Sequence, residues 1–121
     1  MQISRPSTQF SPEPILLASK GNLSVTLHYF ERENDISSER IEFQTVRAYR
    51  KVSEPFCEAW HYNLGYDCVT GMSKSAWLDE IADRERRPGL QTRHFVLAFD
   101  SWGCLEVLAS SAALVPNTDA A

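Results

Sequence analysis

The clearest structural signal in this chain is Phe95-Val-Leu-Ala-Phe-Asp-Ser-Trp-Gly-Cys-Leu-Glu-Val-Leu-Ala109, where two apolar runs flank a turn. Asp100 suits the first position of a type I turn and Gly103 the left-handed position after it, which predicts a β-hairpin with a three-residue loop. We expect Asp100 to pair with Cys104, because a one-residue slip would place Glu106 among the aromatic side chains. One face then carries Phe95, Leu97, Phe99, Leu105, Val107 and Ala109, and the other carries His94, Val96, Ala98, Cys104, Glu106 and Leu108.

Further strands are predicted before this hairpin. Residues 23–30 alternate between apolar and polar side chains, as a half-buried strand does. Residues 41–49 predict a second strand, but their apolar positions change parity, which a bulge near Gln44 or Thr45 would explain. Residues 56–62 suit either a third strand or a helical turn, and residues 111–115 suit either a short helical turn or a strand.

One main helix is predicted over residues 73–87, with Ser73 or Ser75 as its N-cap and Pro88-Gly89 after its end. Its apolar stripe includes Trp77 and Ile81, which we expect to pack on the aromatic face of the hairpin. The element order β-β-(β)-α-β-β indicates an α+β fold. It consists of an antiparallel sheet of four to five strands with the helix on one face.

The 121-residue length fits one domain. We expect an extended Pro- and Ser-rich arm over residues 1–22, a single α+β domain over 23–115, and a flexible tail over 116–121. Residues 1–20 contain scattered prolines and lack the apolar run of a signal peptide, so we expect a cytoplasmic protein.

The amino-acid composition argues against several classes of binding partner. The formal net charge of −4 argues against a nucleic-acid partner, because that affinity depends on basic side chains. No apolar run approaches the roughly 20 residues that span a bilayer, so we expect no membrane partner. Cys57, His61 and Cys68 have a loose metal-ligand spacing but no obvious fourth ligand. We therefore expect a structural role for them, with no metal and no cofactor.

Acidic residues concentrate between positions 31 and 42, where five acidic side chains stand against two basic ones. Such a segment is either a solvated loop or a surface that steers a basic protein partner. Trp102 at the hairpin tip is either an exposed anchor for a partner or packs locally against Tyr66 or the N-terminal arm. The predicted partner-binding residues are Glu31, Glu33, Asp35, Glu39, Glu42 and Trp102.

A second group of residues suits a small ligand. Glu106 interrupts an apolar strand, where it could act as an acid or base with a raised pKa, or be solvated or paired with Arg47 or Arg93. The cationic and aromatic run 47–51 suits anion capture, or alternatively protects a sheet edge. The possible ligand-binding residues are Arg47, Tyr49, Arg50, His94 and Glu106.

No catalytic signature is present, so the chain is expected not to be an enzyme. A small acidic α+β domain of this make-up is similar to many bacterial immunity or inhibitor proteins that cap a toxin. The leading hypothesis is therefore a protein-binding module that neutralises or regulates a basic toxin or enzyme through its acidic surface. The alternatives are a homodimeric scaffold domain and a ligand-binding or enzymatic domain.

Overall fold

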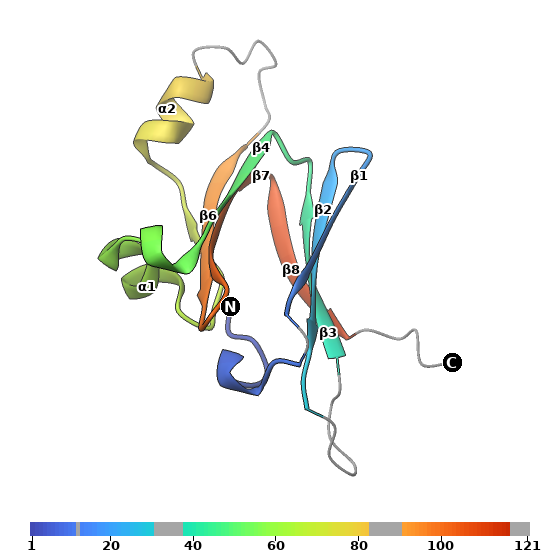
Figure 1. Cartoon of the computed structure of the whole chain (residues 1–121). Coiled ribbons are helices and arrows are strands. Elements are labelled where there is room, and N and C mark those ends of the chain that lie inside the picture. Colours follow the sequence, from blue (N-terminus) through green and yellow to red (C-terminus); the bar gives the residue numbers. More distant parts are fainter. Residues whose placement is uncertain (12, 31–37, 83–90, 117–121) are drawn as a thin grey trace.

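Two four-stranded antiparallel sheets face each other across an apolar core (Figure 1). The computed structural model describes residues 1–11, 13–30, 38–82 and 91–116. The first sheet has the order β1-β2-β3-β8, with strands β1 (Ile15–Ser19), β2 (Asn22–His28), β3 (Ser38–Gln44) and β8 (Ser111–Pro116). The second has the order β4-β7-β6-β5, with strands β4 (Ala48–Val52), β7 (Gly103–Ala109), β6 (Arg93–Phe99) and β5 (Thr70–Met72).

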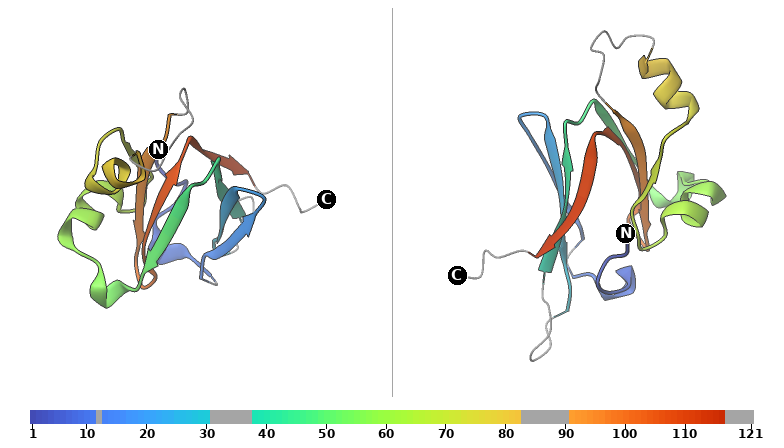
Figure 2. Two further views of the ribbon diagram at one scale, coloured as in Figure 1. Left: turned by 90° about the horizontal axis from the view of Figure 1, so that it is seen from above. Right: turned by 180° about the vertical axis from the view of Figure 1, so that it is seen from behind.

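The fold belongs to the α+β class, as predicted, but the expected single sheet of four to five strands is wrong. The described residues form eight strands in two sheets. Helices α1 (Ala59–Gly65) and α2 (Ala76–Ala82) both lie on the outer side of the second sheet (Figure 2). Two short 3-10 turns, η1 (Ser7–Gln9) and η2 (Glu54–Phe56), complete the described elements.

The predicted hairpin is formed by β6 and β7, and both of its faces are as predicted. Phe99 pairs with Gly103, so Asp100 to Trp102 form the three-residue loop. Cys104 pairs with Ala98 instead of Asp100. This difference of two residues leaves every side chain on its predicted face, because side chains alternate along a strand.

Both faces of this hairpin are buried, which corrects the predicted place of the helix. The aromatic face packs on the first sheet, where the rings of Phe43 and Phe95 have centroids 5.7 Å apart. Helix α2 lies on the opposite face, with the Trp77 ring 5.4 Å from the His94 ring. The expected packing of Trp77 on Phe95, Leu97 and Phe99 is wrong because the first sheet already covers that surface.

The parity change in residues 41–49 marks a crossing between the sheets, and the bulge predicted near Gln44 or Thr45 is wrong. β3 ends at Gln44 in the first sheet, and β4 begins at Ala48 in the second. Thr45 between them has a left-handed backbone, with φ of 54°. The apolar positions change parity because they no longer belong to one strand: Val46 packs against the core from the crossing, whereas Ala48 pairs with Leu108 on the helix-covered face of the second sheet.

The chain makes a second crossing next to the first one, where β7 continues into β8 through Ser110. The Ser110 backbone N–H donates to the Gln44 carbonyl at 2.9 Å, which joins the two crossings. At the other end of the core, the Phe10 ring lies 4.9 Å from Phe99 and 5.5 Å from Tyr29. The core is therefore closed by backbone at one end and by the N-terminal segment at the other.

The remaining open predictions are settled by the backbone. Residues 59–65 form α1, so the 56–62 segment is helical and not a strand. Residues 111–116 form strand β8. Residues 15–19, in the predicted arm, form edge strand β1. Ser75 caps α2, because its Oγ accepts the Leu78 backbone N–H at 3.1 Å, while the predicted helix beyond residue 82 lies outside the described residues.

Gly103 provides a test of the hairpin. Its φ is +115°, and a Cβ atom there would lie 2.1 Å from the Val52 carbonyl oxygen. Gly21 also has a positive φ, of +80°, but a Cβ there would meet no atom within 4 Å. We expect Gly21→Ala to lower the free energy of unfolding by about 1 kcal/mol and Gly103→Ala by about 3 kcal/mol or more. Urea denaturation measures both values, and equal losses would contradict the clash with β4.

Candidate functional site

Glu106 is the buried carboxylate at the centre of the candidate site. It lies on β7, and its contact with His61 of α1 places the carboxylate on the helix-covered side of the second sheet. Only 2% of the Glu106 surface is exposed. An ionised carboxylate in such a place needs hydrogen-bond donors, because burying an unpaired charge is costly.

Three side chains from three different elements bind this carboxylate. The Arg50 guanidinium on β4 donates to Oε2 from Nε at 2.8 Å and to Oε1 from Nη2 at 3.0 Å. His94 Nε2 on β6 lies 2.7 Å from Oε1, and His61 Nε2 on α1 lies 3.2 Å from Oε2. The site thus joins β4, β6, β7 and α1.

These contacts set the ionisation of Glu106. Burial alone would raise the pKa of the carboxyl group. The hydrogen bonds from His94, Arg50 and His61 outweigh burial and lower the pKa of Glu106 to about 2. The group is therefore a carboxylate at neutral pH and acts only as an acceptor, so the raised pKa considered for an acid or base does not apply.

The proton of His61 is fixed by the start of α1. The Glu58 backbone N–H donates to His61 Nδ1 at 2.9 Å, as part of a capping box in which the Glu58 side chain accepts the His61 backbone N–H. Nδ1 must therefore be unprotonated, and the ring carries its proton on Nε2, facing Glu106. The same imidazole caps a helix and binds the carboxylate.

His94 connects Glu106 to the start of α2. Its Nε2 faces the ionised Glu106 and must be the donor, while its Nδ1 lies 2.8 Å from Ser75 Oγ. Because Ser75 Oγ also accepts the Leu78 N–H, its hydroxyl proton is available for Nδ1 of a neutral His94. A continuous row of hydrogen bonds thus runs from Ser75 through His94 to Glu106.

Aromatic rings enclose this polar group. The Arg50 guanidinium carbon lies 4.2 Å from the centroid of the Trp77 ring, which also meets His94 edge to face. Trp60 stacks on His61 with centroids 3.9 Å apart. The Arg50 side chain is 51% exposed, whereas both histidines are buried. Arg50 is thus the member of the group that faces solvent.

The structure brings together three of the five predicted ligand-binding residues. Arg50, His94 and Glu106 are in contact, and the predicted pairing of Glu106 with Arg47 or Arg93 is replaced by Arg50. Arg47 and Tyr49 lie on the opposite side of β4, where they line a hollow together with residues 18–22.

Sequence reasoning missed His61 and Ser75 as partners of this group. The spacing of Glu58 and His61 fits a capping box, which could have indicated the helix start but not the contact with Glu106. Cys57, His61 and Cys68 do not share a metal site. Within the described ranges, no group of three or more His, Cys, Asp or Glu side chains is placed to hold a metal ion.

Glu39 does not belong to the predicted acidic surface. Glu31, Glu33 and Asp35 lie outside the described residues. Glu39 is buried: it accepts hydrogen bonds from the Ser4 N–H at 2.8 Å, the Ser4 hydroxyl at 2.6 Å and the Tyr29 hydroxyl at 2.5 Å. Its role as an exposed partner-binding charge is therefore wrong, because it fastens the N-terminal segment to the first sheet.

The other two predicted partner contacts have different surroundings. Glu42 is half-buried and pairs with Arg40 at 2.7 Å. Trp102 is only 8% exposed, so an exposed anchor at the hairpin tip is wrong. Its ring lies 5.5 Å from Phe99 and under the Lys51 ammonium, and it lines a hollow with the N-terminal segment. Trp102 is therefore packed locally on Phe99, and it faces the N-terminal arm across that hollow.

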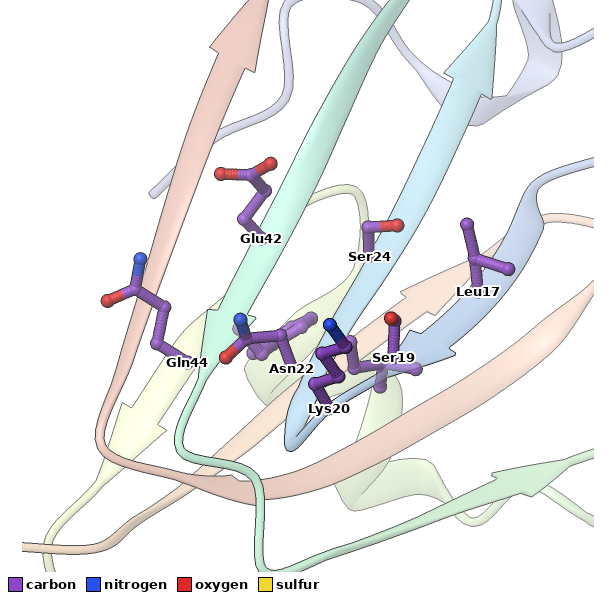
Figure 3. Close-up of a pocket in the computed structure, with 9 residues that line it drawn as sticks. Leu17, Ser19, Lys20, Asn22, Ser24, Glu42 and Gln44 are labelled. Carbon is purple, nitrogen blue, oxygen red and sulfur yellow. The ribbon is translucent and has the colours of Figure 1, made fainter.

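None of the described helices lies on the outer face of the first sheet (Figure 2), and this face contains a second candidate surface. Leu17 on β1, Ser24 on β2 and Glu42 on β3 lie across neighbouring strands and line a hollow (Figure 3). Leu17 is 66% exposed. This surface combines an apolar edge strand, β1, with polar side chains.

Comparison with family models, curated proteins and solved structures found no match to this chain. None of the described helices has the length and apolar character required to cross a membrane.

Glu106→Gln tests how much the carboxylate stabilises the fold. The amide keeps the shape but loses the charge and turns a donor toward the buried histidines, so we expect a loss of about 2–4 kcal/mol in the free energy of unfolding. Glu42→Gln is the matched control on a partly exposed ion pair, with an expected change within about 0.5 kcal/mol. Chemical denaturation at pH 7 measures both, and similar losses would contradict a special role for Glu106.

Acid should remove the contribution of Glu106. Its folded-state pKa, about 2, lies below the ordinary 4.5, so its stabilisation is complete above pH 4.5 and declines as the pH falls toward 2. We expect the stability difference between the wild type and Glu106→Gln to be constant from pH 7 to 5 and to shrink toward pH 2. A difference that stays constant down to pH 2.5 in urea titrations would contradict the lowered pKa.

Proposed function

We propose that this chain is a non-catalytic protein-binding module that takes an extended segment of a basic partner at the β1 edge of its first sheet. The observation that carries this proposal is an apolar edge strand without the usual protection. Ile-Leu-Leu-Ala-Ser, residues 15–19, contains no charge and no proline. In the described part of the chain, β1 pairs only with β2, so its other edge has unpaired backbone groups.

Edge strands of soluble proteins are commonly protected by charges, prolines or bulges, because an open edge pairs readily with another strand. Binding domains use such edges to add a strand of the partner, with main-chain hydrogen bonds for affinity and alternate side chains for specificity. Ile15 and Leu17 are both exposed and share one face of β1. They would contact alternate side chains of the added strand.

Charge supports a basic partner. The chain has a formal net charge of −4, and Glu42 lies in the hollow beside Leu17. The acidic residues Glu31, Glu33 and Asp35 follow β2, the strand that pairs with β1. Charges at the rim of an interface mainly raise the association rate and exclude partners of like charge.

The Glu106 site supports a non-catalytic role. Both oxygens of its carboxylate already accept hydrogen bonds from within the protein, and His61 and His94 are buried. These side chains hold four elements together and leave no buried base free for a substrate. A role in neutralising or regulating a toxin or enzyme in the cytoplasm fits a small domain of this kind and remains part of the proposal.

A photo-crosslinking amino acid placed at Leu17 tests the proposal in the native host. We expect a covalent adduct with one basic protein at position 17, and none when the same group replaces Phe56, which is 76% exposed on η2. Ile15→Lys should reduce binding of the identified partner by at least about tenfold without lowering the melting temperature. Identical adducts at both positions would overturn the proposal, and a second copy of the chain as the adduct would favour the homodimer.

A second candidate, a hydrolase, is favoured by the row of hydrogen bonds from Ser75 through His94 to Glu106. A serine whose proton passes to a histidine, which a carboxylate orients, is the arrangement of a nucleophilic triad. Ser75 is half-buried, so it is the member of this row nearest to solvent. In this candidate Ser75 is the nucleophile, His94 the base and Glu106 the orienting acid.

Labelling with a fluorophosphonate probe tests this second candidate. A nucleophilic Ser75 would be labelled once, and the label would be absent from Ser75→Asn, which retains a helix-capping side chain. Ser73→Ala, two residues earlier in the chain, is the control that should be labelled as the wild type is. A wild-type protein that stays unlabelled would refute the hydrolase.

A further inference from the structure

Two thiols outside the hydrogen bonds of the Glu106 site are in direct contact. The sulfur atoms of Cys57 and Cys104 lie 2.9 Å apart, although 47 positions separate the residues in the sequence. A disulfide bond is about 2.05 Å long, so the two atoms need to approach by roughly 0.9 Å to be joined. The two sulfur atoms are therefore close enough for a bond to form after a small movement of the side chains.

The two thiols differ in access to solvent. Cys104 lies on β7 and is fully buried, while Cys57 follows η2 and is half-buried. Burial, together with the hydrogen bond from Cys57, raises the pKa of the Cys104 thiol above its ordinary value. A reagent in solution therefore meets Cys57 first.

The third cysteine has separate surroundings. Cys68 donates to the Leu64 carbonyl at 3.4 Å and lies 3.7 Å from Thr70 Oγ1. Among the described residues its hydrogen bonds are to Leu64 and Thr70 and not to the other two thiols, which makes it a suitable internal control.

The geometry points to a reversible disulfide between Cys57 and Cys104, formed by exchange with a low-molecular-weight disulfide such as oxidised glutathione. The Cys57 thiolate attacks one sulfur of the reagent, whose S–S bond breaks and releases one glutathione thiolate. The Cys104 thiolate then attacks the Cys57 sulfur of the mixed disulfide and releases the second glutathione. The two thiol protons pass to the two glutathione thiolates, so the protein is oxidised by two electrons and the reagent is reduced by two.

This bond would fasten the segment between η2 and α1 to β7, two residues before Glu106 on the same face of the strand. It would therefore tie α1 to the sheet covalently beside the contact that His61 makes. Cross-linking residues far apart in sequence stabilises a fold mainly by restricting the unfolded chain. The oxidised protein should melt roughly 5–15 °C higher than the reduced one.

The experiment treats the folded, full-length chain with oxidised glutathione, then alkylates the remaining thiols in denaturant. We expect one alkylated cysteine in place of three, a mass lower by two hydrogens before alkylation, and a linked peptide pair containing Cys57 and Cys104. Dithiothreitol should restore three reactive thiols and the lower melting temperature. Three alkylated cysteines after glutathione treatment, or a link that contains Cys68, would overturn the inference.

Single variants test the order of the two steps. Cys104→Ser should accumulate one stable glutathione adduct on Cys57, and Cys57→Ser should resist the reagent at Cys104. Cys68→Ser should form the disulfide as the wild type does. An adduct on Cys104 in folded Cys57→Ser would overturn the assignment of Cys57 as the attacking thiol.

Discussion

The ionised carboxylate of Glu106 is the constraint on which the second sheet and its helices depend. One charge, buried under two helices, receives donors from β4, β6 and α1, and reaches α2 through Ser75. Two donors come from the strands that pair with β7 and the third from helix α1, which packs on β6, so the polar contacts reinforce the packing. A buried charge is stable only when its hydrogen-bond donors are in place. The positions of β4, β6, β7 and α1 therefore all depend on the Glu106 side chain.

Burial on both faces explains why the hairpin sequence looks so apolar. A sheet covered on one side alternates between apolar and polar residues, whereas β6 and β7 are buried on both sides. The inner face packs against another sheet, and the outer face packs beneath helices whose aromatic rings surround the polar cluster. The described helices leave the first sheet uncovered, and its outer face carries polar residues together with the exposed Ile15 and Leu17.

The local signals predict the β6–β7 hairpin, β2 and the start of α2, but they miss β1 and β5 and join β3 to β4. The alternation in residues 95–109 correctly predicted both faces of the hairpin, and Ser75 was correctly named as a possible helix cap. Sequence spacing does not show that the first sheet covers the aromatic face, so it predicts the helix on the wrong side of the hairpin. Glu106 and His94 were named because polar residues are unusual in an apolar strand. Their contacts with Arg50 and His61 depend on tertiary packing, which no local pattern encodes.

The two crossings at Gln44 and Ser110 act as a hinge between the two sheets. At that edge the layers share continuous backbone, and a hydrogen bond joins the two crossing points. The two sheets cannot slide past one another at this end, so they can separate only by a hinge motion about the two crossings. The opposite margin is closed by the N-terminal segment, whose backbone hydrogen-bonds to residues beside both sheets and whose Phe10 ring lies between Tyr29 and Phe99. Water entering the core would therefore pass the N-terminal segment, which closes the end opposite the crossings.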